Sequence, residues 1–144
     1  MVSQRAGRNA QRGAVVIEFA LVFVLFFIVM YGIVAYGVIF AVKHSLVQAA
    51  NEGARAAVRD VGGVTARVDL ARTVAAESLA WLGDKAPEPQ VSAALCAATP
   101  YVCLKVELAY DYAANPLVPA LPALGVALPE RLTGQAMVQL DAVY

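Results

Sequence analysis

The stretch Gly13-Ala14-Val15-Val16-Ile17-Glu18-Phe19 opens the apolar run that dominates this chain of 144 residues. Residues 14–42 contain a single charged side chain, that of Glu18. About 20 apolar residues are enough to cross the hydrocarbon core of a bilayer, and the 29 residues of this run would measure roughly 44 Å as a helix. The sequence therefore predicts a membrane-spanning helix over residues 14–42, which either tilts or continues beyond the bilayer.

The carboxylate of Glu18 lies only five positions into this run. An acid at the centre of a spanning helix costs about 2.5–3.5 kcal/mol on insertion scales and less near the interface, so such a residue indicates a function. In a second interpretation, Glu18 reaches the lipid headgroups and is favoured by the positive N-terminal end of the helix. The residues alone leave both interpretations open.

The formal net charge of zero hides an asymmetry along the chain. Residues 1–13 carry Arg5, Arg8 and Arg12 and no acid, whereas eight basic and ten acidic residues follow residue 42. Positive flanking segments tend to stay in the cytoplasm, so we predict a cytoplasmic N-terminus and an external C-terminal domain. No clustered basic face of the kind that binds nucleic acid is evident, and no nucleic-acid partner is expected.

The basic leader, Gly13, the glutamate at the fifth position after it and the long apolar helix together resemble the class III signal of type IV pilins and pseudopilins. More narrowly, the chain resembles TadE-like proteins, the minor pilins or pseudopilins of the tight-adherence (Flp) pilus system. The segments that carry this resemblance are Arg12-Gly13-Ala14-Val15-Val16-Ile17-Glu18-Phe19-Ala20-Leu21-Val22, Tyr31-Gly32-Ile33, Tyr36-Gly37 and residues 48–57 (QAANEGARAA).

The resemblance implies that a prepilin peptidase cleaves between Gly13 and Ala14 at the cytoplasmic face of the bacterial inner membrane. The helix would then assemble with other pilins, pilus assembly proteins and membrane lipid as its partners. Glu18 would pair with the terminal amine of a neighbouring subunit. That amine titrates near 8 and is mostly cationic at neutral pH, and its attraction to a carboxylate is stronger in apolar surroundings than in water. Such a pair would set the axial register of the helices.

The whole chain is expected to adopt an α+β, pilin-like fold. We predict a basic leader over residues 1–13, the transmembrane helix over 14–42, its aqueous continuation over 43–61, and a small extracytoplasmic domain over 64–144. The leader has no periodicity and is predicted to be flexible, as suits a segment that a peptidase must grip. A second helix is predicted over residues 69–82, with Trp81 packed and Gly83 as its C-cap. Its apolar face is expected to comprise Val68, Ala71, Ala75, Leu79 and Leu82.

The last part of the chain changes to a period of two, which is typical of half-buried strands. Strands are predicted over residues 102–112 and 132–141, with a shorter one over 91–95. These should form a small antiparallel sheet packed on the aqueous helices. The connection over residues 115–129 is rich in proline and leucine and is predicted to pack over the sheet, with room for one helical turn.

An aromatic stripe and a pair of cysteines complete the candidate residues. Helical spacing places four rings on one face, either as a packing surface between subunits or simply toward lipid: Phe19, Phe23, Phe27 and Tyr31. Cys96 and Cys103 have too few accompanying ligands for a zinc site. An extracytoplasmic location predicts a disulfide between them, and the alternative is two buried free thiols.

No catalytic residues, metal site or cofactor are predicted, and His44 is interpreted as a polar interfacial residue. The chain is therefore expected to be the substrate of an enzyme rather than an enzyme. The apolar run is about twice as long as that of a cleaved secretory signal. The alternative hypothesis is an uncleaved single-pass membrane protein whose periplasmic domain binds a partner or the cell wall. A pseudopilin of type II secretion fits less well, because neither Phe nor Met follows Gly13 directly.

Overall fold

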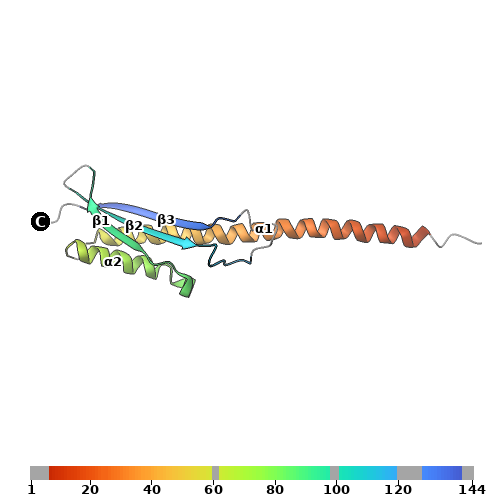
Figure 1. Ribbon diagram of the computed structural model, residues 1–144, viewed down its shortest axis with the longest axis horizontal. Coiled ribbons are helices and arrows are strands. Elements are labelled where there is room, and N and C mark those ends of the chain that lie inside the picture. The colour runs from red at the N-terminus through yellow and green to blue at the C-terminus, as the bar shows by residue number, and fades with distance from the viewer. Residues whose placement is uncertain (1–6, 60–61, 98–100, 120–127, 141–144) are drawn as a thin grey trace, which may run out of the picture. The chain divides into compact units, whose positions relative to one another are not determined.

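The computed structural model describes residues 7–59, 62–97, 101–119 and 128–140 of the chain (Figure 1). Two helices, a short 3-10 helix and three strands follow one another: α1 (Gly7–Ala57), α2 (Val64–Glu77), η1 (Ala80–Lys85), β1 (Gln90–Leu95), β2 (Val102–Asp111) and β3 (Arg131–Leu140). The chain divides into two compact units, Met1–Gly37 and Val38–Tyr144. The predicted α+β fold, with a long N-terminal helix, a second helix and a small antiparallel sheet, is confirmed.

Helix α1 begins earlier than the sequence analysis expected. The leader was predicted to be flexible up to Gly13, but residues 7–13 are already helical. Each residue added to an existing helix gains a hydrogen bond, and no proline interrupts residues 7–57, so the helix propagates through this polar segment. Gly13 and Ala14 consequently lie inside a helix rather than at its start.

Helix α1 also ends earlier, at Ala57 instead of residue 61. The buried Arg67 side chain closes this end, because its Nη1 donates to the Ala57 carbonyl at 2.9 Å and its Nε donates to the Gly62 carbonyl at 3.2 Å. A cation is favourable at the carbonyl end of a helix. Gly62 has φ +104°, which residues with a side chain rarely adopt, and this conformation turns the chain back toward α2.

The second helix was predicted over residues 69–82, and both limits were wrong. Helix α2 starts immediately after Gly63, at Val64, and ends at Glu77. The Ser78 hydroxyl donates to the Val74 carbonyl at 2.9 Å at this end, and the chain then tightens into η1. Gly83 lies at a kink inside η1 with φ +56°, so it is not the C-cap of an α-helix.

The burial of residues 68–82 agrees with the sequence for one face and disagrees for the tryptophan. Ala71, Ala75 and Leu79 are fully buried, as predicted for the core face. Trp81 was predicted to pack, but it is 58% exposed because the tighter winding of η1 turns it away from the core.

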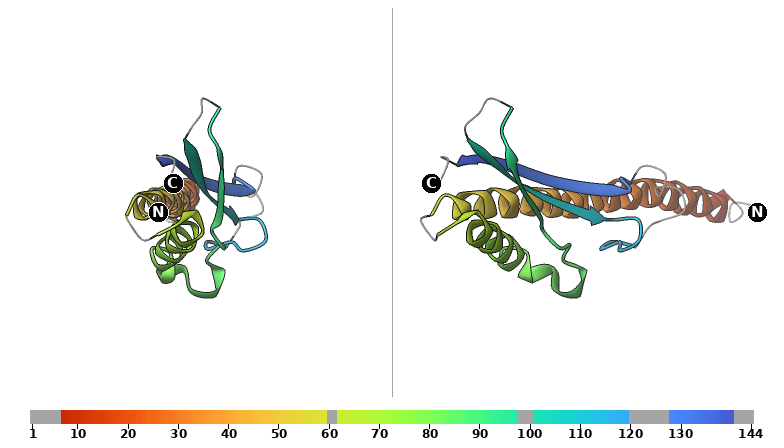
Figure 2. Two further views of the ribbon diagram at one scale, coloured as in Figure 1. Left: turned by 90° about the vertical axis from the view of Figure 1, so that its left-hand side faces the viewer. Right: turned by 60° about the vertical axis from the view of Figure 1, so that its left-hand side comes forward.

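The three strands form an antiparallel sheet in the order β1-β2-β3. The predicted alternation is confirmed along β2, where Leu104, Val106 and Leu108 are buried and the residues between them are half-buried. The C-terminal part of α1 and helix α2 contribute to the same core as this inner face (Figure 2). Most of the connection predicted over residues 115–129 lies outside the described residues.

Two glycines allow the helices and the sheet to approach closely. A Cβ atom on Gly134 of β3 would fall against the Leu46 carbonyl and 2.7 Å from the Val47 nitrogen of α1. A Cβ atom on Gly53 would lie 2.8 Å from the Ala71 carbonyl oxygen of α2. The C-terminal part of α1 therefore provides the surface on which both the sheet and α2 pack.

We predict that Gly134→Ala destabilises the second unit by about 1–3 kcal/mol, the usual cost of overpacking a close contact. The new methyl group would meet the backbone of α1, which cannot move aside as a side chain can. Denaturant unfolding of the full chain in detergent, followed by near-ultraviolet circular dichroism, measures the effect. Gly63→Ala is the matched control, because its Cβ meets nothing within 4 Å and its φ of −68° suits alanine. Equal midpoints for the two variants would contradict the prediction.

Candidate functional site

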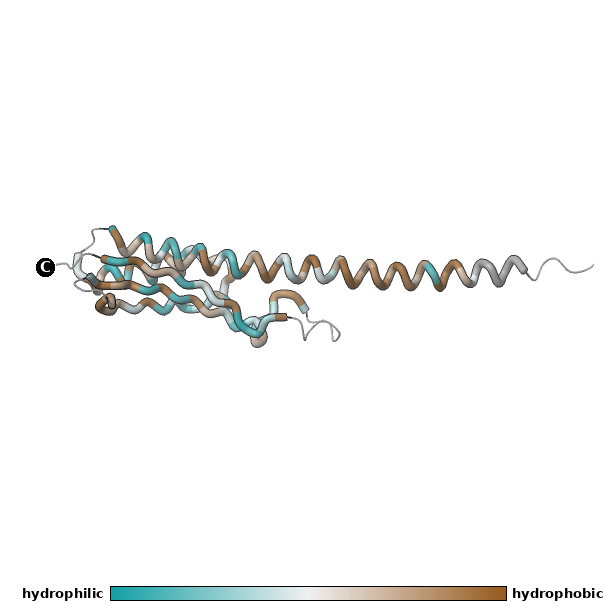
Figure 3. Tube along the Cα trace, turned by 90° about the horizontal axis from the view of Figure 1, so that it is seen from above, coloured by the Kyte–Doolittle hydropathy of each residue, from teal (hydrophilic) through white to brown (hydrophobic). Residues whose placement is uncertain are grey.

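The first half of α1 exposes an uninterrupted apolar surface. Val15, Leu21 and Ile33 are 63%, 67% and 69% exposed, and Figure 3 shows apolar residues along nearly the whole of this half. Among the described residues, one helix is long and apolar enough to cross a membrane, and its most apolar part has no buried residue. Such a surface is too large to face water, so the finding agrees with a membrane protein.

The last part of the apolar run has a different role. Within the second unit, Ile39, Val42 and Leu46 are at most 4% exposed and belong to its hydrophobic core. The surface that is exposed on nearly all sides of the helix therefore extends over residues 14–34, which span roughly 32 Å and match a hydrocarbon core of about 30 Å. In the rest of the run one face forms protein core, while Phe40 on another face is still 67% exposed.

The predicted processing and assembly residues lie on the surface of α1. Gly13, Ala14 and Glu18 are all exposed and helical. A Cβ atom on Gly13 would meet nothing within 4 Å, so packing within this chain does not require glycine there. Within the described part of the chain, Glu18 takes part in no ion pair. Gly13 and Glu18 thus lie on the outer surface of the helix, open to whatever surrounds it.

The aromatic side chains form the stripe that the sequence predicted. The ring centroids of Phe19 and Phe23 are 6.0 Å apart, those of Phe23 and Phe27 are 6.4 Å apart, and the rings are stacked. Phe19 is 68% and Phe27 is 47% exposed, so the stacked rings still offer about half or more of their surface to lipid or to another helix. Tyr31 lies one turn further along and is half-buried.

Cys96 and Cys103 form a disulfide, and their Cα atoms are 5.1 Å apart. The bond closes the hairpin between β1 and β2, and the Cys96 amide also donates to the Tyr101 carbonyl at 3.0 Å. Disulfides persist in oxidising compartments, so this pair favours an extracytoplasmic second unit.

The turn that leaves β2 contains a polar arrangement that the sequence analysis missed. The Tyr110 hydroxyl donates to the Asn115 carbonyl at 2.7 Å, and the Ala114 amide donates to Asp111 Oδ1 at 2.9 Å. Burial, with a smaller contribution from Tyr112, raises the pKa of Tyr110 above its ordinary value. A phenol is protonated at physiological pH in any case, and the shift extends the pH range over which the Tyr110 hydroxyl can donate. The Asp-x-x-x-Asn sequence at the end of the strand, Asp111 to Asn115, was the available signal.

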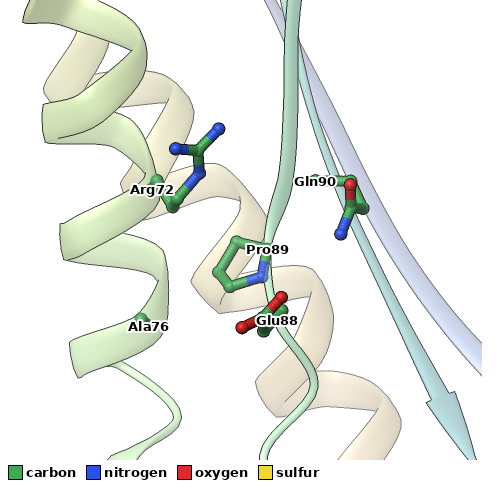
Figure 4. A pocket seen from close by; sticks show the side chains of 5 residues that line it. All are labelled: Arg72, Ala76, Glu88, Pro89 and Gln90. Carbon is green, nitrogen blue, oxygen red and sulfur yellow. The ribbon is translucent and has the colours of Figure 1, made fainter.

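A surface pocket of about 410 Å³ lies between α2 and the start of β1, lined by Arg72, Ala76, Glu88, Pro89 and Gln90. Arg72 Nη1 is already 3.6 Å from Asp69 Oδ1. Figure 4 shows that the Arg72, Glu88 and Gln90 side chains do not converge on a common point. Nucleophilic and acid–base catalysis need groups within hydrogen-bond reach of one another, and this pocket does not supply them.

A comparison with protein families finds a match, and the matched residues lie within α1. Residues 13–55 match the model of the TadE-like protein family. The family resemblance predicted from the sequence is confirmed over this segment. No curated protein and no solved structure was found to match the chain. The TadE-like segment begins at Gly13 and ends two residues before the end of α1, so α2 and the sheet lie outside it.

We predict that Cys96 and Cys103 resist thiol labelling in the oxidised protein and react fully after reduction, because they are joined in the structure. Cys96→Ser with Cys103→Ser should lower the stability of the hairpin by about 2–3 kcal/mol, as expected for a loop this short. Mass spectrometry of the labelled full chain, before and after reduction, measures the thiols. Immediate labelling of both cysteines in protein isolated from its native membrane would contradict the prediction.

Proposed function

We propose that this chain is a minor pilin or pseudopilin required for the biogenesis of a tight-adherence (Flp-type) pilus. In this proposal, a prepilin peptidase removes residues 1–13, and the protein assembles through the exposed half of α1. The single observation that carries the proposal is the match of residues 13–55 to the TadE-like family, over the segment that presents Gly13, Glu18 and the aromatic stripe outward.

The proposed topology places the N-terminus in the cytoplasm and the second unit in the periplasm, with α1 in the inner membrane. The leader is basic and the exposed apolar surface is one bilayer thick. The disulfide supports the periplasmic location of the second unit. In this topology Gly13 lies at the cytoplasmic face, within reach of a membrane-embedded peptidase.

The helical conformation of residues 7–13 adds a step to the proposed cleavage. A peptidase that binds an extended backbone must first unwind the start of α1. Glycine favours the helix less than alanine by about 1 kcal/mol, so Gly7 and Gly13 lower the cost of unwinding. After cleavage, the new amine of Ala14 would stand one turn from Glu18, on the outward surface of the helix.

The proposed role of Glu18 is to pair with the amine of a neighbouring subunit. Within the described residues its carboxylate has no ion-pair partner, and an exposed acid in an apolar surface is costly in lipid. A neighbour's ammonium would compensate that cost and fix the axial offset between helices. The stacked rings of Phe19, Phe23 and Phe27 supply apolar contact area beside this pair.

The second candidate function is an uncleaved single-pass protein whose periplasmic domain binds a partner or the cell wall. It accounts equally well for the exposed apolar surface and the disulfide. It requires neither Gly13 nor Glu18, so variants of these residues distinguish the two proposals.

The proposal predicts that the protein, expressed with its prepilin peptidase and extracted from membranes, begins at Ala14. Gly13→Ala or a bulkier residue should leave the leader attached, and the structure gives no reason for such a variant to misfold. Intact mass and N-terminal sequencing measure the processed fraction. Gly32→Ala is the matched control, because its Cβ also meets nothing within 4 Å and it should be processed normally. Normal processing of the Gly13 variants would refute the proposed cleavage.

Glu18→Ala should still be cleaved but should assemble into pili about tenfold less efficiently or worse, since each 1.4 kcal/mol of lost pairing is a factor of ten. Glu52→Ala is the control on the same helix, because Glu52 forms only a long surface ion pair with Arg55, at 3.9 Å. Quantification of sheared pili and of the incorporated subunit gives the result. Unchanged assembly of the Glu18 variant would favour the interpretation that its carboxylate merely reaches the headgroups.

A further inference from the structure

One end of the second unit lies where the chain enters from the apolar half of α1. Lys43, the first charged residue after Glu18, donates from its Nζ to the Thr133 carbonyl at 3.2 Å. Asp111 of β2 lies opposite Arg131 of β3 in the strand register, at the last position of the β2–β3 ladder and next to this contact. The connection between β2 and β3 therefore leaves the sheet at the end of the unit that is nearest Val38.

This connection is unusually apolar. Residues 116–129 contain no charged side chain and no side chain that can form a hydrogen bond. The structure describes both ends of the run, where Leu117, Val118 and Leu128 are half-buried. Soluble loops of this length normally contain polar residues, because a loop runs over a surface that faces water.

The exposed tryptophan lies at the same end. Lys85, the last residue of η1, approaches the Pro116 carbonyl with its Nζ at 3.5 Å, which joins η1 to the start of the apolar connection. Figure 1 shows η1, in green, beside the end of β2. Trp81 in η1 is 58% exposed, and the core gives no reason for its position.

We propose that this end of the second unit, comprising Trp81, Lys85 and the apolar connection at Pro116 to Val118, rests in the headgroup region of the bilayer that α1 crosses. Tryptophan concentrates at membrane interfaces because its ring is apolar and its N–H remains hydrated. Lysine buries its stem and keeps its ammonium among the headgroups. The position follows from the chain itself, since the contact of Lys43 with Thr133 places the sheet end beside the last residues of the apolar run.

The contact would limit how the second unit tilts on its helix before assembly. The opposite end of the sheet, where Leu95 pairs with Val102 beside the disulfide, would then face away from the membrane. The inference rests on the membrane insertion of α1 within the proposed function, and it is independent of cleavage and of pilus assembly.

Trp81 is the only tryptophan in the chain, so its fluorescence reports on this end directly. The full chain is reconstituted at low density into vesicles of phosphatidylethanolamine and phosphatidylglycerol, with and without lipids brominated near the top of the acyl chains. We expect blue-shifted emission, strong quenching by the brominated lipid and severalfold weaker quenching by aqueous acrylamide than for an exposed tryptophan.

The matched control moves the tryptophan to the other end of the sheet, as Leu95→Trp in a Trp81→Phe background. Leu95 is 73% exposed and lies at the distal end of β1. This variant should be quenched by acrylamide and unaffected by brominated lipid. Similar lipid quenching for both positions would show that the second unit collapses on the bilayer without a defined end, and would overturn the inference.

Two further outcomes also overturn it. Quenching of Trp81 by acrylamide but not by lipid would mean that this end is in water. Protection from both quenchers would mean that another protein surface, such as a second copy of the chain, covers Trp81. Alkaline extraction of the same vesicles tests the insertion of α1, and N-terminal sequencing tests cleavage. If both succeed while the quenching fails, the inference is wrong and the proposed function stands.

Discussion

The second unit depends on the close contact between the sheet and α1 at Gly134. With no side chain at this position, β3 lies directly against the backbone of Leu46 and Val47. Gly53 gives α2 the same access to α1 from another direction, and small residues bury the rest of the contact. Backbone proximity of this kind increases dispersion contacts but tolerates no added atom. The fold therefore uses α1 as its central element rather than as a stalk.

The two halves of α1 have different patterns of exposed and buried side chains, and each pattern suits a different environment. Up to residue 34 its apolar side chains are exposed in every direction, which suits lipid. From Ile39 onward its apolar residues recur every three or four positions on one face, which suits the core of a small domain. The change from one pattern to the other occurs without a break in the helix.

The residues proposed to function in processing and assembly lie apart from those that hold the fold together. Gly13 and Glu18 make no packing contact that the fold requires, so the roles proposed for them depend on groups outside the chain. Arg67, in contrast, is buried and closes the end of α1, so its side chain stabilises the fold itself. The family match follows this division, since it covers α1 and stops before α2 and the sheet.

The sequence by itself determined a helix long and apolar enough to cross a membrane, the segment that resembles TadE-like proteins, the faces of the strands and the cysteine pair. These depend on local composition and on periods of two or 3.6 residues, which are visible without knowledge of distant contacts. Only the tertiary structure decided where α1 ends, because Arg67 caps Ala57 from ten residues away. It also decided that Trp81 faces outward and that Ile39 and Val42 are core, since both depend on how η1 and the sheet meet elements far apart in the chain. A sequence pattern shows which side of a helix is apolar, but only packing shows what that side touches.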